Sequence, residues 1–168
     1  MKVSGIANAN IALTKYWGKK NPELKTPYNS STSVTLEGLQ TTTTVEFDEK
    51  YTEDIFILDG DEYKTGEGEY DNVHEQLDLI RAKAGIEQKA KVVSKNDFPT
   101  AAGFASSASG LAALTFVAAK AAGLDSSVEE LSKISRMGSG SASRSLIDGF
   151  AIWHKGEQED GEDSFAEQ

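Results

Sequence analysis

Three segments of the chain carry apolar residues at helical spacing. The first repeats its apolar positions every three or four residues and is followed by Gly85, which is typical of a helix end. The second is rich in alanine and ends on a glycine, and the third follows polar residues suited to an N-cap. The predicted helices are Asp71–Ala84, Leu111–Gly123 and Val128–Met137.

Runs of β-branched and aromatic residues predict strands, most of them in the N-terminal half. Asp59–Gly60 before Glu62–Tyr63 predicts a hairpin turn, and Val3–Ala9 is a poorly patterned segment that suits an edge strand. The other predicted strands are Ser30–Leu36, Thr41–Phe47, Asp54–Leu58, Ala90–Ser94 and Phe150–His154. Early strands followed by later helices indicate an α+β fold.

Length and composition indicate a single globular domain. The chain has 168 residues, without internal repeats or a linker, and 38% of them are hydrophobic. No apolar run approaches the ~20 residues of a membrane span, and the first residues lack the apolar core of a secretion signal. The absence of cysteine excludes disulfides and thiolate metal sites. We therefore expect a cytoplasmic protein without a membrane partner.

The charge distribution narrows the choice of ligand. A net charge of −10 argues against nucleic acid and anionic membranes as partners. Much of the acid lies in Asp48–Asp71 and Glu157–Glu167, which we expect to be solvated loops and a tail. Several cations lie instead within or beside glycine- and serine-rich segments, so local positive potential is expected there. These cations are Lys15, Lys19, Lys20, Arg136 and Arg144.

The stretch Phe98–Gly110 has no charged side chain and runs directly into the alanine-rich helix. A loop of glycine, alanine and serine lets backbone N–H groups approach a ligand, and a helix N-terminus favours negative charge. Phosphate suits such a place. Small residues also serve close helix packing, and the serines could form an N-cap. A glycine-rich loop by itself leaves both interpretations open.

The stretch Asn10–Lys20 combines two aromatic residues and three lysines around Gly18. One interpretation is a surface loop that Tyr16 and Trp17 anchor to the core while the lysines face water. The other is an anion pocket, in which the Tyr16 hydroxyl and the lysine ammonium groups converge on phosphate. The residues alone leave both open.

The stretch Gly138–Ser145 is a second candidate for anion binding. Serine hydroxyls donate hydrogen bonds without charge, and Arg144 can grip a carboxylate or phosphate with two parallel hydrogen bonds. A flexible connector is the alternative, but connectors rarely place an arginine among alanine and serine. We favour the binding interpretation.

Histidine and tryptophan add little to the candidate chemistry. Neither His74 nor His154 has a second histidine at ligand spacing, so surface or packing roles are expected and no metal ligand is assigned. Trp17 and Trp153 are expected to pack.

Together, the three stretches resemble the diphosphomevalonate decarboxylases of the GHMP kinase superfamily. The resemblance extends through Pro27–Leu36 and the closing Glu159–Ser164. It implies a GHMP-type N-terminal domain (ribosomal protein S5 domain 2-like) over residues 1–168, a β-rich sheet with helices packed on one face. It also implies ATP and Mg²⁺ as cofactors, and a reaction that converts 5-diphosphomevalonate into isopentenyl diphosphate, phosphate and carbon dioxide.

The resemblance assigns roles to particular residues. Lys15 and Arg144 would be catalytic, with Lys15 near the transferring phosphoryl group and Arg144 on the C1 carboxylate, positioned through Asn10. The residues implied to bind substrate are Asn10, Tyr16, Trp17, Gly18, Lys19, Ser139, Gly140, Ser141, Ala142, Ser143 and Arg144. Those implied to bind the nucleotide are Pro99, Ala102, Gly103, Ala105, Ser106, Ser107, Ala108 and Ser109.

Three departures qualify these roles. Family members are roughly twice this length and carry the catalytic aspartate in their C-terminal half, so we expect a truncated or split enzyme with little activity. The serines and arginine of Gly138–Ser145 replace an aspartate of related kinases, which favours a decarboxylase over mevalonate kinase. Asn72 replaces a cation, which leaves open a monophosphate substrate or a 3-kinase.

The remaining alternative is a non-catalytic nucleotide- or phosphate-binding domain. The partners implied are a phosphorylated mevalonate, and a homodimer or a separate C-terminal half. Without that half, we expect apolar surface to be exposed.

Overall fold

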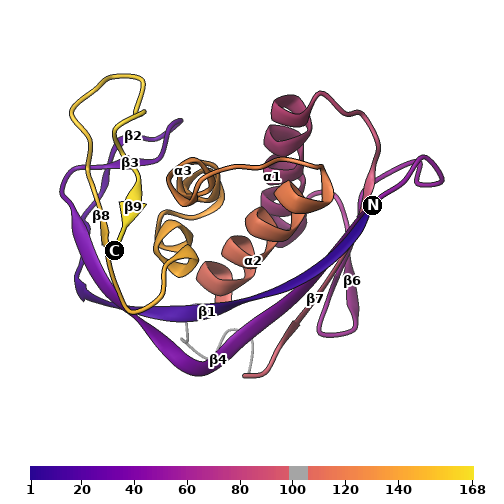
Figure 1. Ribbon diagram of the computed structural model, residues 1–168, viewed down its shortest axis with the longest axis horizontal. Coiled ribbons are helices and arrows are strands. Elements are labelled where there is room, and N and C mark those ends of the chain that lie inside the picture. The colour runs from indigo at the N-terminus through magenta and orange to yellow at the C-terminus, as the bar shows by residue number, and fades with distance from the viewer. Residues whose placement is uncertain (99–105) are drawn as a thin grey trace.

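The computed structural model describes residues 1–98 and 106–168, which form one main sheet with helices on one of its faces (Figure 1). The strand order is β6-β5-β7-β4-β8-β9, with β1 paired to β4, and β2 and β3 form a separate hairpin. The strands are β1 Lys2–Thr14, β2 Lys19–Asn21, β3 Thr26–Pro27, β4 Ser31–Phe47, β5 Ile55–Leu58, β6 Asp61–Tyr63, β7 Ala90–Asn96, β8 Phe150–Trp153 and β9 Ala166–Glu167. The helices are α1 Gly68–Ala84, α2 Ser106–Ala121, α3 Val128–Gly138 and the 3-10 helix η1 Gly140–Leu146.

The expected α+β arrangement, with helices on one face of the sheet, is confirmed (Figure 1). Helix α1 ends at Gly85, which has the left-handed φ of 66° expected of a C-terminal glycine. Helix α3 begins with a capping box, in which Ser127 and Glu130 exchange hydrogen bonds. Asp59 and Gly60 form the predicted turn, with φ of 53° and 100°.

Strands β1 and β4 differ from the prediction. The short edge strand and the following loop are partly one element, because β1 continues through Asn10 to Thr14. The two predicted strands around residue 38 are also one strand, since β4 pairs with β1 on both sides of Gly38. Gly38 has a φ of 82°, and the pairing jumps there from Asn8↔Gln40 to Asn10↔Thr35. The glycine thus marks an irregularity within a long strand and not a hairpin.

The core lies between the sheet and helices α1 and α2. Fully buried side chains from both layers include Val45, Val92, Leu77, Ile80, Leu114 and Val117. Alanine and glycine let α2 approach β1 closely, because a Cβ added at Gly5 would lie 2.8 Å from Val117 Cγ2. Helix α2 begins at Ser106, five residues before the predicted start. No helix among the described residues is long and apolar enough to cross a membrane.

A second, smaller core fixes the other end of the molecule. Trp153 is completely buried with Ile147, Ala151 and Ala166, and Tyr16 packs against this cluster. The packing expectation for Trp153 is therefore confirmed. This cluster joins β8, β9 and the segment after η1 to the loop that follows β1.

The two acidic segments are not merely solvated. Asp54 is buried and accepts hydrogen bonds from the Arg81 guanidinium at 3.0 and 2.8 Å and from the Ala90 N–H at 2.8 Å. His74 Nδ1 lies 2.6 Å from the same carboxylate, so this histidine has a hydrogen-bonding and packing role.

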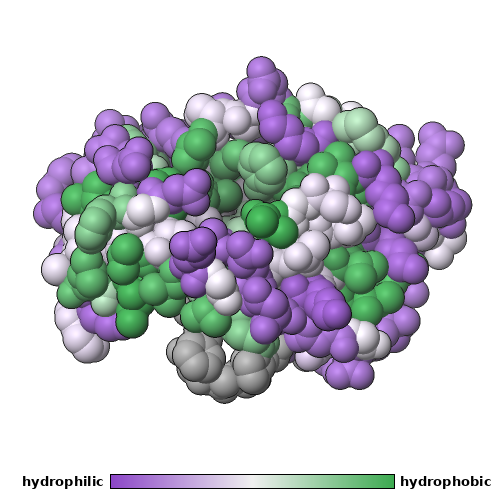
Figure 2. Space-filling model, turned by 60° about the horizontal axis from the view of Figure 1, so that its bottom comes forward, coloured by the Kyte–Doolittle hydropathy of each residue, from purple (hydrophilic) through white to green (hydrophobic). Residues whose placement is uncertain are grey.

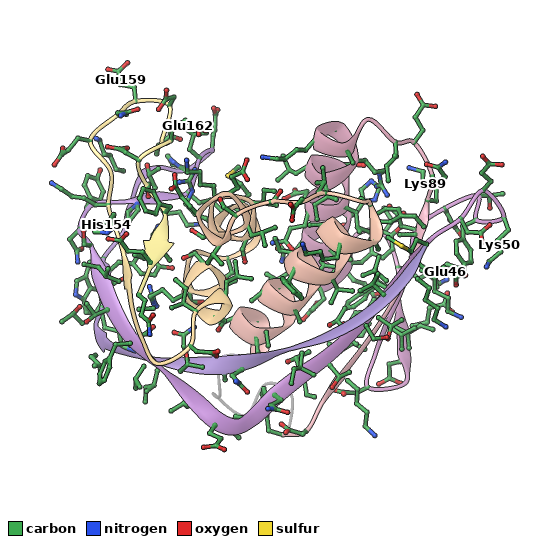
Figure 3. All side chains as sticks on the ribbon, viewed as in Figure 1. Glu46, Lys50, Lys89, His154, Glu159 and Glu162 are labelled. Carbon is green, nitrogen blue, oxygen red and sulfur yellow. The ribbon has the colours of Figure 1, made fainter. Side chains whose placement is uncertain are left out.

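The expectation that Glu157–Glu167 is a solvated tail is also wrong in part. Glu159 and Glu162 lie on the loop between β8 and β9 (Figure 3), but Ser164 and Ala166 beyond them are buried. The Arg136 guanidinium donates to the carbonyl oxygens of Gly161 and Ser164 and holds this segment against α3. Arg136 thus uses Nη1 for backbone carbonyl oxygens of the β8–β9 segment.

The opposite face of the sheet carries exposed apolar side chains. Ile11 and Phe150 are 51% and 67% exposed, and both pair with Val34 on β4. Figure 2 turns this face forward and shows apolar groups in green among hydrophilic ones.

Candidate functional site

The structure brings together two of the three singled-out stretches. Asn10 on β1 donates from Nδ2 to the carbonyl oxygen of Ser141 at 3.0 Å and to Ser145 Oγ at 2.7 Å. Tyr16 packs edge-on against Trp153, with ring centroids 4.9 Å apart. The aromatic-lysine loop and the glycine-serine segment therefore form the two sides of one candidate site.

The glycine-serine segment is a buried 3-10 helix, so the flexible-connector alternative is wrong. Its turns are closed by the hydrogen bond from Ala142 N to Ser139 O at 2.9 Å and by Ser143 Oγ donating to Gly140 O at 2.7 Å. Gly140 is required by packing, because an added Cβ would lie 2.6 Å from Trp153 Cη2 and 3.2 Å from the Tyr16 hydroxyl. The segment is rigid because the aromatic cluster supports it.

Arg144 is the most unusual residue of the segment. Its side chain is almost completely buried, and Nη1 donates to Ser31 Oγ at 2.6 Å. Its Nε has no hydrogen-bond partner among the described residues. No carboxylate of the described residues forms an ion pair with the Arg144 guanidinium. Burial lowers the pKa of Arg144, and Tyr16 opposes this shift. A buried cation without a counter-ion is costly, and a bound anion would relieve that cost.

Among the described residues, Asn10 holds the segment that carries Arg144 and does not bond to the guanidinium itself. Both of its hydrogen bonds go to η1, on either side of the arginine, at Ser141 and Ser145. The direct partner of Arg144 is Ser31, which the sequence analysis missed. No motif signals this role, because Ser31 lies in an ordinary β-branched run whose partner is 113 residues away.

The aromatic-lysine loop presents its charges to solvent. Lys15 and Lys19 are exposed and form no ion pair within residues 1–98 and 106–168. Trp17 is 76% exposed, so the expectation that it packs is wrong. The loop is held from behind by Asn29, whose Oδ1 accepts from Trp17 N at 3.0 Å and whose Nδ2 donates to Lys15 O at 3.0 Å. Asn29 is a further residue that the sequence analysis missed.

Two hydroxyl groups lie on the glycine-serine side of the candidate site. Ser139 Oγ and Ser141 Oγ lie 3.1 Å apart, and both residues are half-buried. Ala142 and Ser143, which the resemblance also implies as substrate-binding residues, are fully buried in η1. The candidate site therefore combines a buried guanidinium, exposed ammonium groups and paired hydroxyls, which are all hydrogen-bond donors of the kind that suits an anion.

The third stretch is described only in part. Pro99, Ala102, Gly103 and Ala105 lie outside the described residues, and Ser106 begins α2. Ala108 and Ser109 are fully buried, and Ser109 Oγ lies 2.7 Å from Thr41 Oγ1 on β4. Ser107 is exposed.

A cavity of about 160 Å³ opens beside the first turns of α2. Ser107 and Gly110 line it together with Asn72 of α1 and apolar side chains of the sheet. Its walls are mainly apolar, as in pockets for flat ligands. Asn72 therefore lines this cavity. The replacement of a cation by Asn72 thus affects the charge of this cavity and the ligand that it would hold.

Comparisons with known proteins agree with these features. The family model of the diphosphomevalonate decarboxylase-like N-terminal domain matches residues 7–166. The human diphosphomevalonate decarboxylase is 42% identical over 99% of this chain and 44% of the human protein. The chain thus spans about half the length of such relatives.

Solved structures give the same result. The mevalonate diphosphate decarboxylase of Enterococcus faecalis superposes with a TM-score of 0.89 and 50% identity, over 100% of this chain and 52% of the other. A structure described as MDDEF in complex with MVAPP, AMPPCP and magnesium has the same TM-score of 0.89 and 50% identity, over 100% of this chain and 51% of that chain.

Proposed function

Because the chain belongs to the family of diphosphomevalonate decarboxylase-like N-terminal domains, we propose that it forms the substrate-binding half of an ATP-dependent diphosphomevalonate decarboxylase. In this reaction ATP phosphorylates the tertiary hydroxyl of 5-diphosphomevalonate. The new phosphate then leaves and the carboxylate is lost as carbon dioxide, so that isopentenyl diphosphate, ADP and phosphate are formed.

The observation that carries the proposal is the buried guanidinium of Arg144. Within the described part of the chain, its Nη1 donates to Ser31 and its Nε has no hydrogen-bond partner. The C1 carboxylate of the substrate would supply the missing acceptor and counter-ion. Held there, the carboxylate is oriented so that its electrons flow toward the departing phosphate as carbon dioxide leaves.

The diphosphate of the substrate would lie toward the aromatic-lysine loop. Lys19 and the Tyr16 hydroxyl would donate to it from one side, and Ser139 and Ser141 from the other. Lys15 would lie nearer the transferring phosphoryl group and stabilise its negative charge. Trp17 and Gly18 complete this loop.

The nucleotide would bind at the N-terminal end of α2. The apolar cavity beside Ser107 and Gly110 suits a base, and a helix N-terminus suits phosphates. No group of three or more acidic or histidine residues among those described could hold a metal ion. Mg²⁺ would therefore enter with the nucleotide phosphates, which is its usual mode of binding.

The proposal assigns other parts of the enzyme to residues that do not belong to this chain. We infer that the catalytic aspartate belongs to the half of the relatives that this chain does not span, and that such a half, or a second copy, is the protein partner. The chain by itself would then bind ligands but turn over little.

A titration of the chain with 5-diphosphomevalonate, mevalonate 5-phosphate and ATP, followed by calorimetry, tests the proposal. We expect 5-diphosphomevalonate to bind more tightly than the monophosphate, because more donors contact it. Tighter binding of the monophosphate would favour the phosphomevalonate alternative. Binding of ATP without either mevalonate ester would indicate a nucleotide-binding domain and overturn the proposal.

A further inference from the structure

Lys25 makes an unusual contact between two distant parts of the chain. It lies in the turn between β2 and β3, and its ammonium group donates to the carbonyl oxygens of Met137 and Gly138, the second at 3.3 Å. These are the last residues of α3, whose carbonyl groups have no partner within the helix. A cation at this end of a helix is also favoured by the helix dipole.

The turn that carries Lys25 is itself firmly held. Asn21 Oδ1 accepts from the backbone N–H groups of Glu23 and Leu24 at 2.9 and 3.0 Å. Thr26, the next residue after Lys25, is buried. The hairpin backbone therefore fixes the point from which the Lys25 side chain extends. Lys25 is not a freely moving surface lysine.

Lys25 occupies this position at some energetic cost. Its backbone has a left-handed φ of 52°, which is uncommon for residues other than glycine and asparagine. Burial lowers the pKa of its ammonium group, Glu75 on α1 opposes this shift, and Lys19 adds to it. The contact with the two carbonyl groups compensates for part of this cost.

The two carbonyl groups immediately precede the serines of the candidate site. Ser139 follows Gly138, while the hairpin that carries Lys25 begins at Lys19. One side chain thus ties the lysine side of the site to its serine side. Figure 1 shows the β2–β3 hairpin beside the end of α3.

We propose that Lys25 is a positioning residue that sets the distance between Lys19 and the hydroxyl pair of Ser139 and Ser141. It acts through the end of α3 and does not touch the ligand. The inference rests on the proposed function, in which these groups bind the diphosphate of the substrate. A residue that only caps α3 would stabilise the fold without affecting ligand selectivity.

Three variants separate these roles in calorimetric titrations of the chain. Lys25→Met removes the ammonium group, Lys25→Asn removes it while suiting the left-handed backbone, and Lys25→Arg keeps the charge. We expect the first two to weaken 5-diphosphomevalonate binding by about tenfold, roughly the value of one net hydrogen bond. ATP affinity should stay as in the wild type, and Lys25→Arg should recover most of the loss.

Unchanged 5-diphosphomevalonate affinity in Lys25→Met and Lys25→Asn would overturn the inference, as would an equal loss for ATP. Wild-type affinity in Lys25→Asn alone would assign the effect to backbone strain and would also overturn it.

Hydrogen exchange gives a readout that needs no ligand. The amide of Ser139 is bonded to Ser135 O at 3.1 Å, and that of Ala142 to Ser139 O at 2.9 Å. Both should exchange faster in Lys25→Met and Lys25→Asn, while amides of α1 and β7 keep their protection. Uniform changes, or none, would overturn the inference. If the wild type bound no mevalonate ester, the proposed function would fail, and with it the selectivity role of Lys25, while exchange would still show whether Lys25 orders the end of α3.

Discussion

Arg144 and Ser31 are 113 residues apart in the sequence, yet Arg144 Nη1 donates a 2.6 Å hydrogen bond to Ser31 Oγ. This bond joins η1 to the beginning of β4 and orients a buried guanidinium. Because Nε lacks a partner among the described residues, the same guanidinium keeps hydrogen-bonding capacity for a ligand. The geometry of the candidate site thus depends on a serine outside its motifs.

The Ser31 hydroxyl should therefore contribute to stability. Ser31→Ala leaves the buried guanidinium with one acceptor fewer, and we expect the free energy of unfolding to fall by about 1–3 kcal/mol. Urea unfolding measures this. Ser33→Ala is the matched control, because Ser33 is equally buried on the same strand and its Oγ has no partner in the described residues. It should change stability by less than about 0.5 kcal/mol; equal losses in both variants would contradict the account.

Lys19 should contribute to ligand binding and not to stability. It is exposed and unpaired within the described residues, so Lys19→Met should weaken 5-diphosphomevalonate binding by about tenfold and leave the unfolding free energy nearly unchanged. Raising the salt concentration should narrow the difference in affinity between the wild type and Lys19→Met, because salt screens the charge of an exposed lysine.

The adjacent Lys20 provides the control for Lys19. The charge of Lys20 acts on Glu157 and Asp163 of the β8–β9 loop. Lys20→Met should therefore leave the affinity for 5-diphosphomevalonate nearly unchanged. An equal effect of both variants would indicate only general electrostatic attraction.

The sequence predicts the local elements of this fold better than its long-range contacts. Helix ends marked by Gly85 and by the capping box at Ser127 are correct, because these signals act within a few residues. The two predicted strands Ser30–Leu36 and Thr41–Phe47 belong to the single strand β4. Only its pairing with β1 on both sides makes it continuous.

The candidate site shows the same limit. Arg136 and Arg144 both lie beside glycine and serine, and the sequence does not distinguish them. The structure does, because Arg136 donates to two backbone carbonyl oxygens, those of Gly161 and Ser164, whereas Arg144 donates to the single hydroxyl of Ser31. Asp54 begins a predicted strand within an acidic segment that is expected to be solvated, and nothing near it in sequence indicates its partner Arg81.

Asp54 should make the protein sensitive to acid. Burial raises the pKa of its carboxyl group, but hydrogen bonds from Arg81, Ala90 and His74 outweigh burial and hold the pKa below its usual range. The stabilisation is therefore present above the unfolded-state pKa of about 3.9 and is lost as the pH falls through the lower folded-state value.

The Asp54→Asn variant tests this dependence by urea unfolding at pH 7 and at acidic pH. We expect a loss of about 3 kcal/mol at pH 7, because the variant leaves the buried Arg81 without its main partner, and a flatter decline in acid. Asp78→Asn is the control, since Asp78 also contacts Arg81 but is 56% exposed. A wild-type acid profile in Asp54→Asn would contradict the assignment.

The central claim is that the buried Arg144 binds the carboxylate of the substrate. Calorimetry of 5-diphosphomevalonate and ATP binding to the wild type, Arg144→Gln and Arg136→Gln tests it most directly. The account predicts that Arg144→Gln loses about tenfold to a hundredfold in affinity for 5-diphosphomevalonate and keeps its affinity for ATP. Arg136→Gln should lower stability without this selective loss. Wild-type affinity for 5-diphosphomevalonate in Arg144→Gln, or loss of ATP binding in its place, would contradict the claim.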